Sequence, residues 1–246
     1  MNNYMLIHGS FGSPFVNWFP YLRNEIEKRD LVVYTPDFPT GVGYQNYENW
    51  SRVLECYVSS GIINEDTVIY AHSIAPIFVC HYLVSHNIKV KRLVFVCGFN
   101  NYLGINEEYD EVNHTMYFDN LEAVKKCADE IVCFYSKNDP YVKYDAEKEF
   151  ADTIATKQIV IEDGGHLNSE SGYTEFKELL EYLWKKDVLL SKKSKYIEPF
   201  SIELIFWTTI ILLILSDLLA LMMIIMSAVF YRQKHKEVIK NIELIK

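Results

Sequence analysis

The chain has 246 residues, half of them hydrophobic, which is enough for one sizeable folded domain with an appendage. Its formal charge of −9 is unevenly spread: residues 1–190 hold 28 acidic against 16 basic side chains, and residues 191–246 hold 5 against 8. An acidic domain binds nucleic acid poorly, because contacts to phosphate dominate that affinity, so we expect no nucleic-acid partner.

Apolar, strand-like runs alternate with segments of helical periodicity from the first residues onward. The predicted strands are residues 3–8, 31–35, 67–71, 92–97, 131–135 and 157–161. The predicted helices are residues 18–29, 45–59, 74–87, 144–155 and 173–185. This alternation is typical of a parallel sheet, and continuous apolar strands indicate that both faces of the sheet are buried. We therefore expect an α/β fold with a mostly parallel sheet of about six strands and helices on both faces.

Residues 98–120 do not follow this alternation, because they are polar, aromatic and irregular. We interpret them as an excursion over the edge of the sheet. Their aromatic side chains either line a binding site for an acyl group or pack against that edge. These side chains are Phe99, Tyr102, Tyr109, Tyr117 and Phe118.

The carboxyl-terminal part differs in composition from the rest. We expect a folded domain over residues 1–186, a Lys- and Ser-rich linker over 187–201, a transmembrane segment over 202–231 and a basic tail over 232–246. Residues 204–231 contain one charge, Asp217, and exceed the roughly 20 residues that a helix needs to cross a bilayer. We therefore expect a single-pass membrane protein, with a buried core helix as the alternative.

Asp217 lies near the middle of this segment, where a charge is unfavourable. It could be neutral, pair with another helix, or mark a break between two shorter helices of a hairpin, so oligomerisation through the segment is a hypothesis. Basic residues flank both ends equally and do not orient the segment. The amino terminus shows no secretory signal, and the five cysteines form an odd set without a C-x-x-C pair. We expect a cytoplasmic folded domain with reduced thiols.

Ser73 stands where a predicted buried strand turns directly into a predicted helix. This order is typical of a nucleophile elbow, in which a strained backbone presents a serine hydroxyl. The residues two positions before and after the serine approach each other in an elbow and must be small. They are Ala71 and Ala75, where glycine is usual. If Ser73 is a nucleophile, the protein is a hydrolase.

Three further strand ends carry suitable chemistry, and the carboxyl ends of parallel strands meet at one edge of a sheet. The first strand leads into His8-Gly9-Ser10, where the backbone N–H of Ser10 can form half of an oxyanion hole. The backbone N–H of Ile74 would form the other half, and together they would stabilise negative charge on a carbonyl oxygen.

Asp139 follows the fifth predicted strand and His166 the sixth. A histidine in this position can act as general base and then as general acid, oriented by the aspartate. The chain order Ser73, Asp139, His166 therefore predicts a catalytic triad. Asp163, three residues before His166, is the rival for the acid role. The other histidines show no metal-ligand spacing, so we expect no metal ion.

The motifs around these residues resemble the small serine hydrolases of the retinoblastoma-binding-protein-nine/YdeN type, a branch of the α/β hydrolase superfamily. The matching motifs are HGS at 8–10, NWFPYL at 17–22, PDFP at 36–39, HSIA at 72–75, SKNDPY at 136–141 and GGHLNSESGY at 164–173. The resemblance spans about residues 3–185 and implies a nucleophile at Ser73, an acid at Asp139, a base at His166 and no cofactor. Ala71 departs from the glycine of the family pattern, and soluble family members lack the membrane tail.

The sequence therefore predicts a membrane-anchored serine hydrolase that cleaves carboxylic esters, thioesters or amides through an acyl-enzyme intermediate, with esterase chemistry favoured. An amide hydrolase of the aminopeptidase type is one alternative. A binding protein that keeps the fold without catalysis is another, and the intact Ser73, Asp139 and His166 argue against it.

Overall fold

The computed structural model describes residues 3–104, 106–182, 222–223, 225–227 and 229. The chain divides into two compact units, Met1–Leu180 and Glu181–Lys246. The sheet and the candidate site lie in the first unit, and the described residues of the second unit are helical.

The transmembrane segment predicted over residues 202–231 lies outside the described residues except for six positions. The predicted linker and basic tail lie outside them entirely. Within the part of the chain that the structure describes, no helix combines the length and the apolar character needed to span a bilayer.

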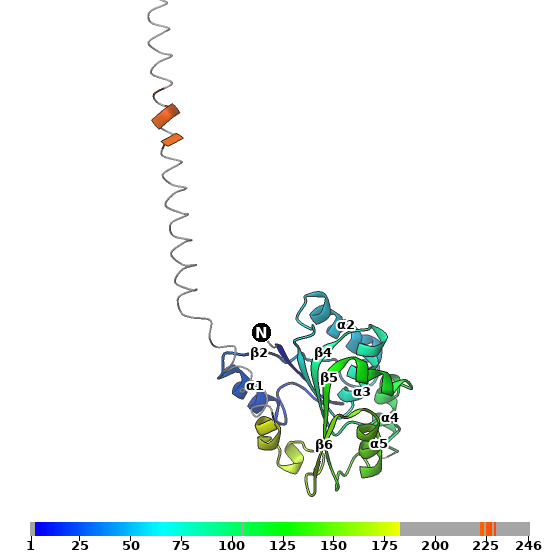
Figure 1. The fold of residues 1–246 in the computed structure, drawn as a ribbon. Coiled ribbons are helices and arrows are strands. Elements are labelled where there is room, and N and C mark those ends of the chain that lie inside the picture. The colour runs from blue at the N-terminus through cyan, green and yellow to red at the C-terminus, as the bar shows by residue number, and fades with distance from the viewer. Residues whose placement is uncertain (1–2, 105, 183–221, 224, 228, 230–246) are drawn as a thin grey trace, which may run out of the picture. The chain divides into compact units, whose positions relative to one another are not determined.

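Six parallel strands form one sheet in the order β2-β1-β3-β4-β5-β6 (Figure 1). They are β1 (Asn3–Ile7), β2 (Val32–Tyr34), β3 (Val68–His72), β4 (Val90–Val96), β5 (Ala128–Ser136) and β6 (Lys157–Ile161). All six predicted strands are present, and every neighbouring pair is parallel. The prediction of a parallel sheet is confirmed.

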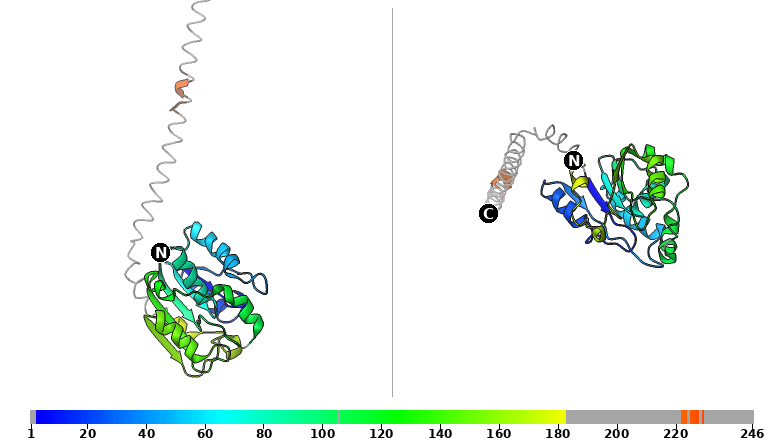
Figure 2. Two further views of the ribbon diagram at one scale, coloured as in Figure 1. Left: turned by 90° about the vertical axis from the view of Figure 1, so that its right-hand side faces the viewer. Right: turned by 90° about the horizontal axis from the view of Figure 1, so that it is seen from below.

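Helices cover both faces of this sheet. They are α1 (Phe19–Glu27), α2 (Tyr47–Ser59), α3 (Ala75–Ser85), α4 (Glu107–Asn113) and α5 (Tyr144–Ile154), and the chain is helical again from residue 177. Figure 1 shows α1 on one face and α2, α3 and α5 on the other, and the view from below in Figure 2 shows the same layers.

Alternating strand side chains build a core on each face. On the face covered by α5, Phe95 of β4 packs against Phe150, with ring centroids 6.0 Å apart. On the face covered by α1, Phe134 of β5 contacts Phe176, and Phe176 contacts Trp18. Burial of large rings on both faces fixes the strands, and so fixes the positions of the loops at their ends.

Among the described residues, α4 is an α-helix that was not predicted from the sequence. Residues 98–120, expected to be irregular, contain α4, which begins after Asn106. The Asn106 side chain accepts a hydrogen bond from the Glu108 N–H at 2.8 Å, and the acidic first turn suits the positive helix terminus. Seven residues are too few to show an apolar period, although an Asn followed by two Glu is a recognisable helix start.

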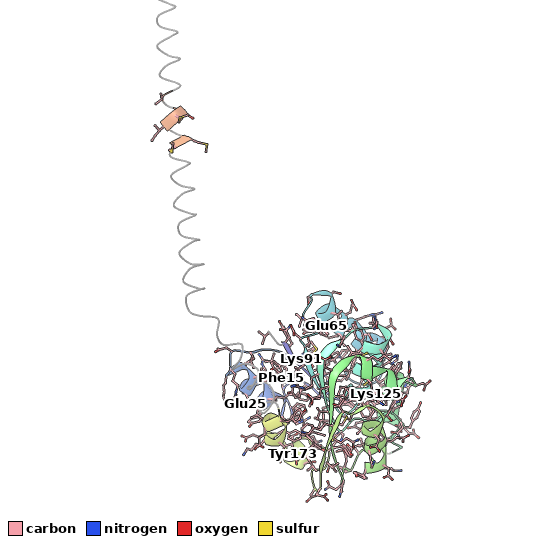
Figure 3. The ribbon with its side chains drawn as sticks, in the orientation of Figure 1. Phe15, Glu25, Glu65, Lys91, Lys125 and Tyr173 are labelled. Carbon is pink, nitrogen blue, oxygen red and sulfur yellow. The ribbon has the colours of Figure 1, made fainter. Side chains whose placement is uncertain are left out.

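The sheet order places the candidate site. The chain runs from β1 to β2 on one side and then crosses to β3 on the other, which opens a crevice at the carboxyl ends of β1 and β3. In Figure 3, Glu65 and Lys91, near the amino ends of β3 and β4, lie on the opposite side of the first unit from Tyr173 in the segment after β6. The candidate residues all follow the carboxyl ends of strands: Ser10, Ser73, Asp139 and His166.

Candidate active site

Ser73 has a strained backbone between β3 and α3. Its φ angle is 63°, in the left-handed region that residues other than glycine rarely occupy. The Ser73 N–H donates to the Val96 carbonyl at 2.9 Å, which ties the turn to β4. Ala71 and Ala75 are fully buried on either side. The local structure therefore has the strand–turn–helix geometry expected of an elbow, with alanine small enough at both neighbouring positions.

Gly9 brings the loop after β1 into direct contact with this elbow. A Cβ atom at Gly9 would lie 2.6 Å from Ser73 Cβ and 3.0 Å from the His72 carbonyl oxygen. One is a backbone atom and the other is bonded directly to the backbone, so neither can move aside as the end of a flexible side chain could. Only glycine fits here, and it holds Ser10 close to Ser73.

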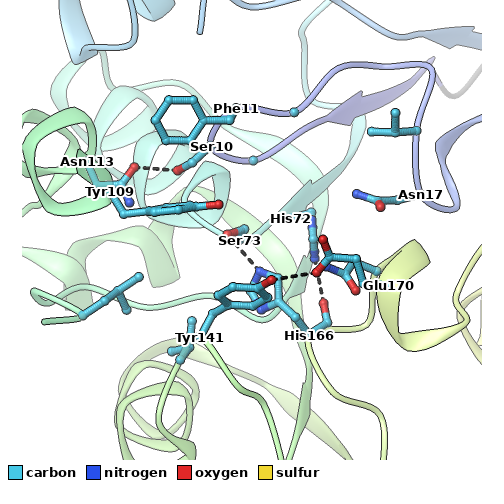
Figure 4. Close-up of a pocket in the computed structure, with 16 residues that line it drawn as sticks. Ser10, Phe11, Asn17, His72, Ser73, Tyr109, Asn113, Tyr141, His166 and Glu170 are labelled. Carbon is cyan, nitrogen blue, oxygen red and sulfur yellow. Dashed lines mark hydrogen bonds between the residues drawn. The ribbon is translucent and has the colours of Figure 1, made fainter. Parts of the chain in front are cut away.

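The structure brings the three predicted residues of the triad into one chain of hydrogen bonds. His166 Nδ1 lies 2.6 Å from Asp139 Oδ2. His166 Nε2 lies 3.1 Å from Ser73 Oγ, the contact drawn in Figure 4. A carboxylate only accepts, so Nδ1 carries the proton. Nε2 is then the acceptor for the Ser73 hydroxyl, which is the tautomer that a general base needs.

Asp139 is held as a carboxylate although its side chain is fully buried. Burial acts to raise its pKa, but the hydrogen bond and charge of His166 and the N–H groups of Val142 and Tyr141 outweigh it, so the pKa is lowered. These two N–H groups donate to Oδ1 at 3.0 and 2.8 Å. Both carboxylate oxygens are therefore engaged, one by the backbone and one by His166.

Asp163, the rival acid, does not contact His166. It is exposed and accepts a hydrogen bond from the Asn138 side chain. The Asn138 side chain in turn accepts from the Gly165 N–H at 2.8 Å. Asp163 thus helps to join the loop after β5 to the loop after β6, and Asp139 is the residue that orients His166.

Two residues without a predicted site role hold the loop of His166. His72 Nε2–H donates to the His166 carbonyl at 3.0 Å, and Trp18 Nε1–H donates to the Leu167 carbonyl at 3.1 Å. Burial, followed by the charge of His166, lowers the pKa of His72 to about 3, so its ring stays neutral. The position of His72 directly before Ser73 was the available signal, but its distant partner was not visible in the sequence.

The two predicted oxyanion donors lie beside the elbow. The Ser10 hydroxyl donates to Asn113 Oδ1 at 2.6 Å, which fixes that loop, and His8 Nδ1–H donates to the Gly9 carbonyl at 2.9 Å. Ile74 is the N-cap of α3, where the helix dipole favours negative charge. Among the described residues, neither the Ser10 nor the Ile74 backbone N–H donates to a protein atom.

A cleft of about 200 Å³ lies over Ser73 and His166. Ligand sites for drug-sized molecules are usually larger, roughly 300–1,000 Å³, so this cleft suits a small group. Of the aromatic residues discussed above, Tyr109 lines the cleft, whereas Phe99 is fully buried and Tyr102 is 65% exposed. Phe99 therefore packs in the core, whereas Tyr109 lies where it could contact a bound group, and its role in binding an acyl group stays a prediction.

Cys97 and Glu147 lie below the triad. The possible ligand atoms of Cys97, Asp139 and Glu147 lie within 4.8 Å of one another, and so do those of His72, Cys97 and His166. Burial raises the pKa of the Cys97 thiol well above its usual range. Asp139, His72 and His166 of these two groups take part in the hydrogen bonds described above.

The parallel six-stranded sheet with a strained serine after β3 has the architecture of the α/β hydrolases. The family model for serine hydrolases matches residues 4–185, and the chain belongs to this family. The match ends before the predicted transmembrane segment.

Individual relatives agree with this assignment. YdeN of Bacillus subtilis (strain 168) is 23% identical over 171 residues, which cover 69% of this chain and 87% of YdeN. Serine hydrolase RBBP9 of Rattus norvegicus is 29% identical over 120 residues, covering 48% of this chain and 59% of RBBP9. The crystal structure of YdeN has a TM-score of 0.65 and covers 79% of this chain and 100% of its own. Est1E of Butyrivibrio proteoclasticus, bound to ferulic acid, has a TM-score of 0.58 at 14% identity, covering 79% and 90%. The chain is a hydrolase with the α/β hydrolase fold, as predicted.

Proposed function

We propose that this hydrolase cleaves carboxylic esters, thioesters or amides through an acyl-enzyme on Ser73, with ester cleavage favoured. The observation that supports this most directly is the ordered contact of Asp139 with His166 and of His166 with a strained Ser73. The hydrogen bonds also support the tautomer that the reaction requires, because Asp139 accepts from His166 Nδ1–H and leaves Nε2 to accept from the Ser73 hydroxyl.

In the first half of the reaction, Ser73 Oγ attacks the carbonyl carbon of the substrate while its proton passes to His166 Nε2. The backbone N–H groups of Ser10 and Ile74 donate to the oxyanion that forms, and losing one such donor slows a reaction by roughly 10²–10³-fold. Asp139 stabilises the imidazolium. The tetrahedral intermediate then releases the alcohol, thiol or amine, which takes the proton from His166.

In the second half, His166 removes a proton from a water molecule that attacks the acyl carbon. The same two backbone N–H groups stabilise the second oxyanion. Collapse of this intermediate releases the carboxylic acid and returns the proton to Ser73.

Labelling with a fluorophosphonate probe tests the nucleophile. We expect one covalent adduct on the wild-type chain, located on the peptide that contains Ser73, and none on Ser73→Ala. Ser60→Ala, which removes an exposed hydroxyl just after α2, should label like the wild type. Absence of an adduct on both the wild type and Ser60→Ala would contradict the proposal and favour a catalytically silent binding protein.

A substrate panel separates the two enzymatic alternatives. We expect hydrolysis of p-nitrophenyl acetate with kcat/KM well above that for aminoacyl p-nitroanilides. The reverse order would replace the esterase assignment with an amide hydrolase of the aminopeptidase type.

We also propose that residues 202–231 attach the hydrolase to the cytoplasmic face of a membrane, on the basis of their apolar composition. The full chain should stay in the membrane pellet after carbonate extraction, whereas a chain truncated before Pro199 should be released. Recovery of both in the supernatant would contradict attachment.

If Asp217 pairs between helices, Asp217→Leu should abolish cross-linking of the full chain in detergent. A monomer for both the wild type and Asp217→Leu would contradict pairing.

A further inference from the structure

Two asparagines that line the cleft have amide groups of fixed orientation. Asn17 Oδ1 accepts hydrogen bonds from the Ser169 N–H at 3.0 Å and the Ser169 hydroxyl at 2.9 Å. Asn168 Oδ1 accepts from the Ser171 N–H at 3.1 Å. Because a backbone N–H can only donate, the accepting atom must be the amide oxygen in both cases. The Nδ2 group of each is left as a donor, without a partner among the described residues.

Asn113 repeats the pattern on the opposite wall. The Phe11 N–H donates to Gln45 Oε1 at 3.1 Å, which fixes the amide of Gln45, and Gln45 Nε2–H then donates to Asn113 Oδ1 at 3.0 Å. Asn113 Nδ2 is buried and has no hydrogen-bond partner in the described structure. All three asparagines of the cleft thus have an engaged oxygen and an N–H₂ group free to donate. For the buried Asn113 this is unfavourable unless a bound molecule accepts, whereas the half-buried Asn17 and Asn168 can exchange water for such an acceptor.

Asn17 and Asn168 lie on the side of the cleft where the leaving group must lie. His166 delivers its proton to the leaving group, and Asn168 follows His166 by two residues. Asn17 is tied to the next residue, Ser169. Figure 4 shows Asn17 at the rim of the cleft, on the same side as Glu170. The two donors therefore face the alcohol part of an ester.

The charge of the cleft indicates the kind of alcohol. No residue that lines it, all of them in the described chain, is Lys or Arg, and residues 1–190 are strongly acidic, so an anionic group is disfavoured. Glu170 supplies an acceptor: one carboxylate oxygen receives the Tyr141 hydroxyl at 2.6 Å, and the other has no partner in the described chain. Neutral hydroxyl groups both accept and donate, so they match amide donors beside a carboxylate.

We propose that the preferred substrates are esters of polyhydroxy alcohols, such as glycerol or a sugar, whose oxygens accept hydrogen bonds from Asn17 and Asn168. This inference rests on the proposed ester hydrolysis, because it names the alcohol that the same site releases. It assigns to the two asparagines the selection of the leaving group.

A matched pair of acetates tests the donors. Heptyl acetate and 2-(2-methoxyethoxy)ethyl acetate have alcohol chains of the same seven atoms, and the second has oxygen in place of two methylene groups. Both carry the same acetyl group, so an effect of a substitution on attack at the acetyl carbonyl is shared and cancels in the ratio of their kcat/KM values. The double variant Asn17→Asp/Asn168→Asp keeps each accepting oxygen and replaces each donor with an acceptor. Asn87→Asp is the control for the added charge, because Asn87 is exposed and its φ of 51° is close to the 57° of Asn17.

In the full-length wild type we expect 2-(2-methoxyethoxy)ethyl acetate to be preferred over heptyl acetate. The ratio of its kcat/KM to that of heptyl acetate should fall at least tenfold in the double variant and stay unchanged in Asn87→Asp. An unchanged ratio in the double variant, with p-nitrophenyl acetate still cleaved, would overturn the inference and leave the proposed function intact. Failure to cleave any of the three esters, together with absence of fluorophosphonate labelling, would overturn both.

Two further acetates identify the source of the alcohol. Preference for glycerol 1-acetate over heptyl acetate would indicate glycerol esters, and preference for glucose 6-acetate would indicate sugar esters. If the wild type cleaves both less efficiently than heptyl acetate, the polyhydroxy class is wrong.

Discussion

Glu147 is a buried carboxyl group within 4.8 Å of Asp139 that the proposed reaction does not use. It lies on α5 with 1% of its surface exposed, and neither oxygen has a hydrogen-bond partner in the described structure. Burial, followed by the negative charge of Asp139, raises the pKa of Glu147 to about 9. Replacing it with glutamine keeps the shape and the neutral charge, and it removes the need for a proton.

The expected gain in stability follows from that pKa. At pH 7 the folded chain holds a proton on Glu147 that the unfolded chain, with a pKa of 4.5, has released. Between these two pKa values the free energy of unfolding falls by about 1.4 kcal/mol for each pH unit because of this group. Relative to Glu147→Gln, the wild type should therefore be less stable by roughly 3 kcal/mol at pH 7 and by less than about 1 kcal/mol at pH 5.

Urea unfolding of the full chain, followed by tryptophan fluorescence at pH 5, 6, 7 and 8, measures this difference. The advantage of Glu147→Gln should grow with pH, whereas Glu149→Gln, on the exposed side of the same helix, should not show such growth. An advantage that does not vary with pH, or a glutamine variant less stable than wild type at pH 8, would mean that native Glu147 is ionised. The electrostatic reasoning would then be wrong.

Three other substitutions test separate contacts. Asp139→Asn should lower kcat for p-nitrophenyl acetate by about 10⁴-fold because His166 loses the partner that fixes its tautomer, and a loss of less than tenfold would remove Asp139 from the triad. The pKa of His72 is about 3 in the folded chain and 6.5 in the unfolded chain, so the free energy of unfolding should fall as the pH drops below 6.5. His72→Gln should reduce this fall by about 1.4 kcal/mol per pH unit. If thermal unfolding shows the same dependence on acid pH for both chains, this reasoning is contradicted. Gly9→Ala places a methyl group 2.6 Å from Ser73 Cβ, so it should reduce the free energy of unfolding by roughly 1–3 kcal/mol and slow fluorophosphonate labelling. Wild-type values for both measurements would refute the close contact.

The sequence predicted most of the sheet because each strand is a separate apolar run bounded by polar turns. Strand ends were enough to bring Ser73, Asp139 and His166 to one edge, since parallel strands present their carboxyl ends together. The φ angle of Ser73 followed from its place between a strand and a helix. These features depend on local pattern and on the order of elements along the chain.

Other parts of the site depend on contacts between distant residues and were not predicted. The bond from Trp18 to the Leu167 carbonyl joins residues 149 apart, and no local pattern marks it. The same holds for Asn17 and Ser169, which are 152 apart. The protonation of Glu147 also depends on the packing around it, because the sequence of α5 shows it only as one of several acidic residues of a helix.

The wholly parallel sheet has a consequence for how activity is acquired during folding. No two neighbouring strands are joined by a hairpin, so each pairing must wait for a crossover connection to form, and proteins with such distant contacts fold slowly. Ser73 and His166 are 93 residues apart and meet only when β3 and β6 both belong to the sheet. After dilution from denaturant, reactivity towards a fluorophosphonate should therefore appear later than helical circular dichroism, and refolding intermediates should be rich in helix but chemically inert.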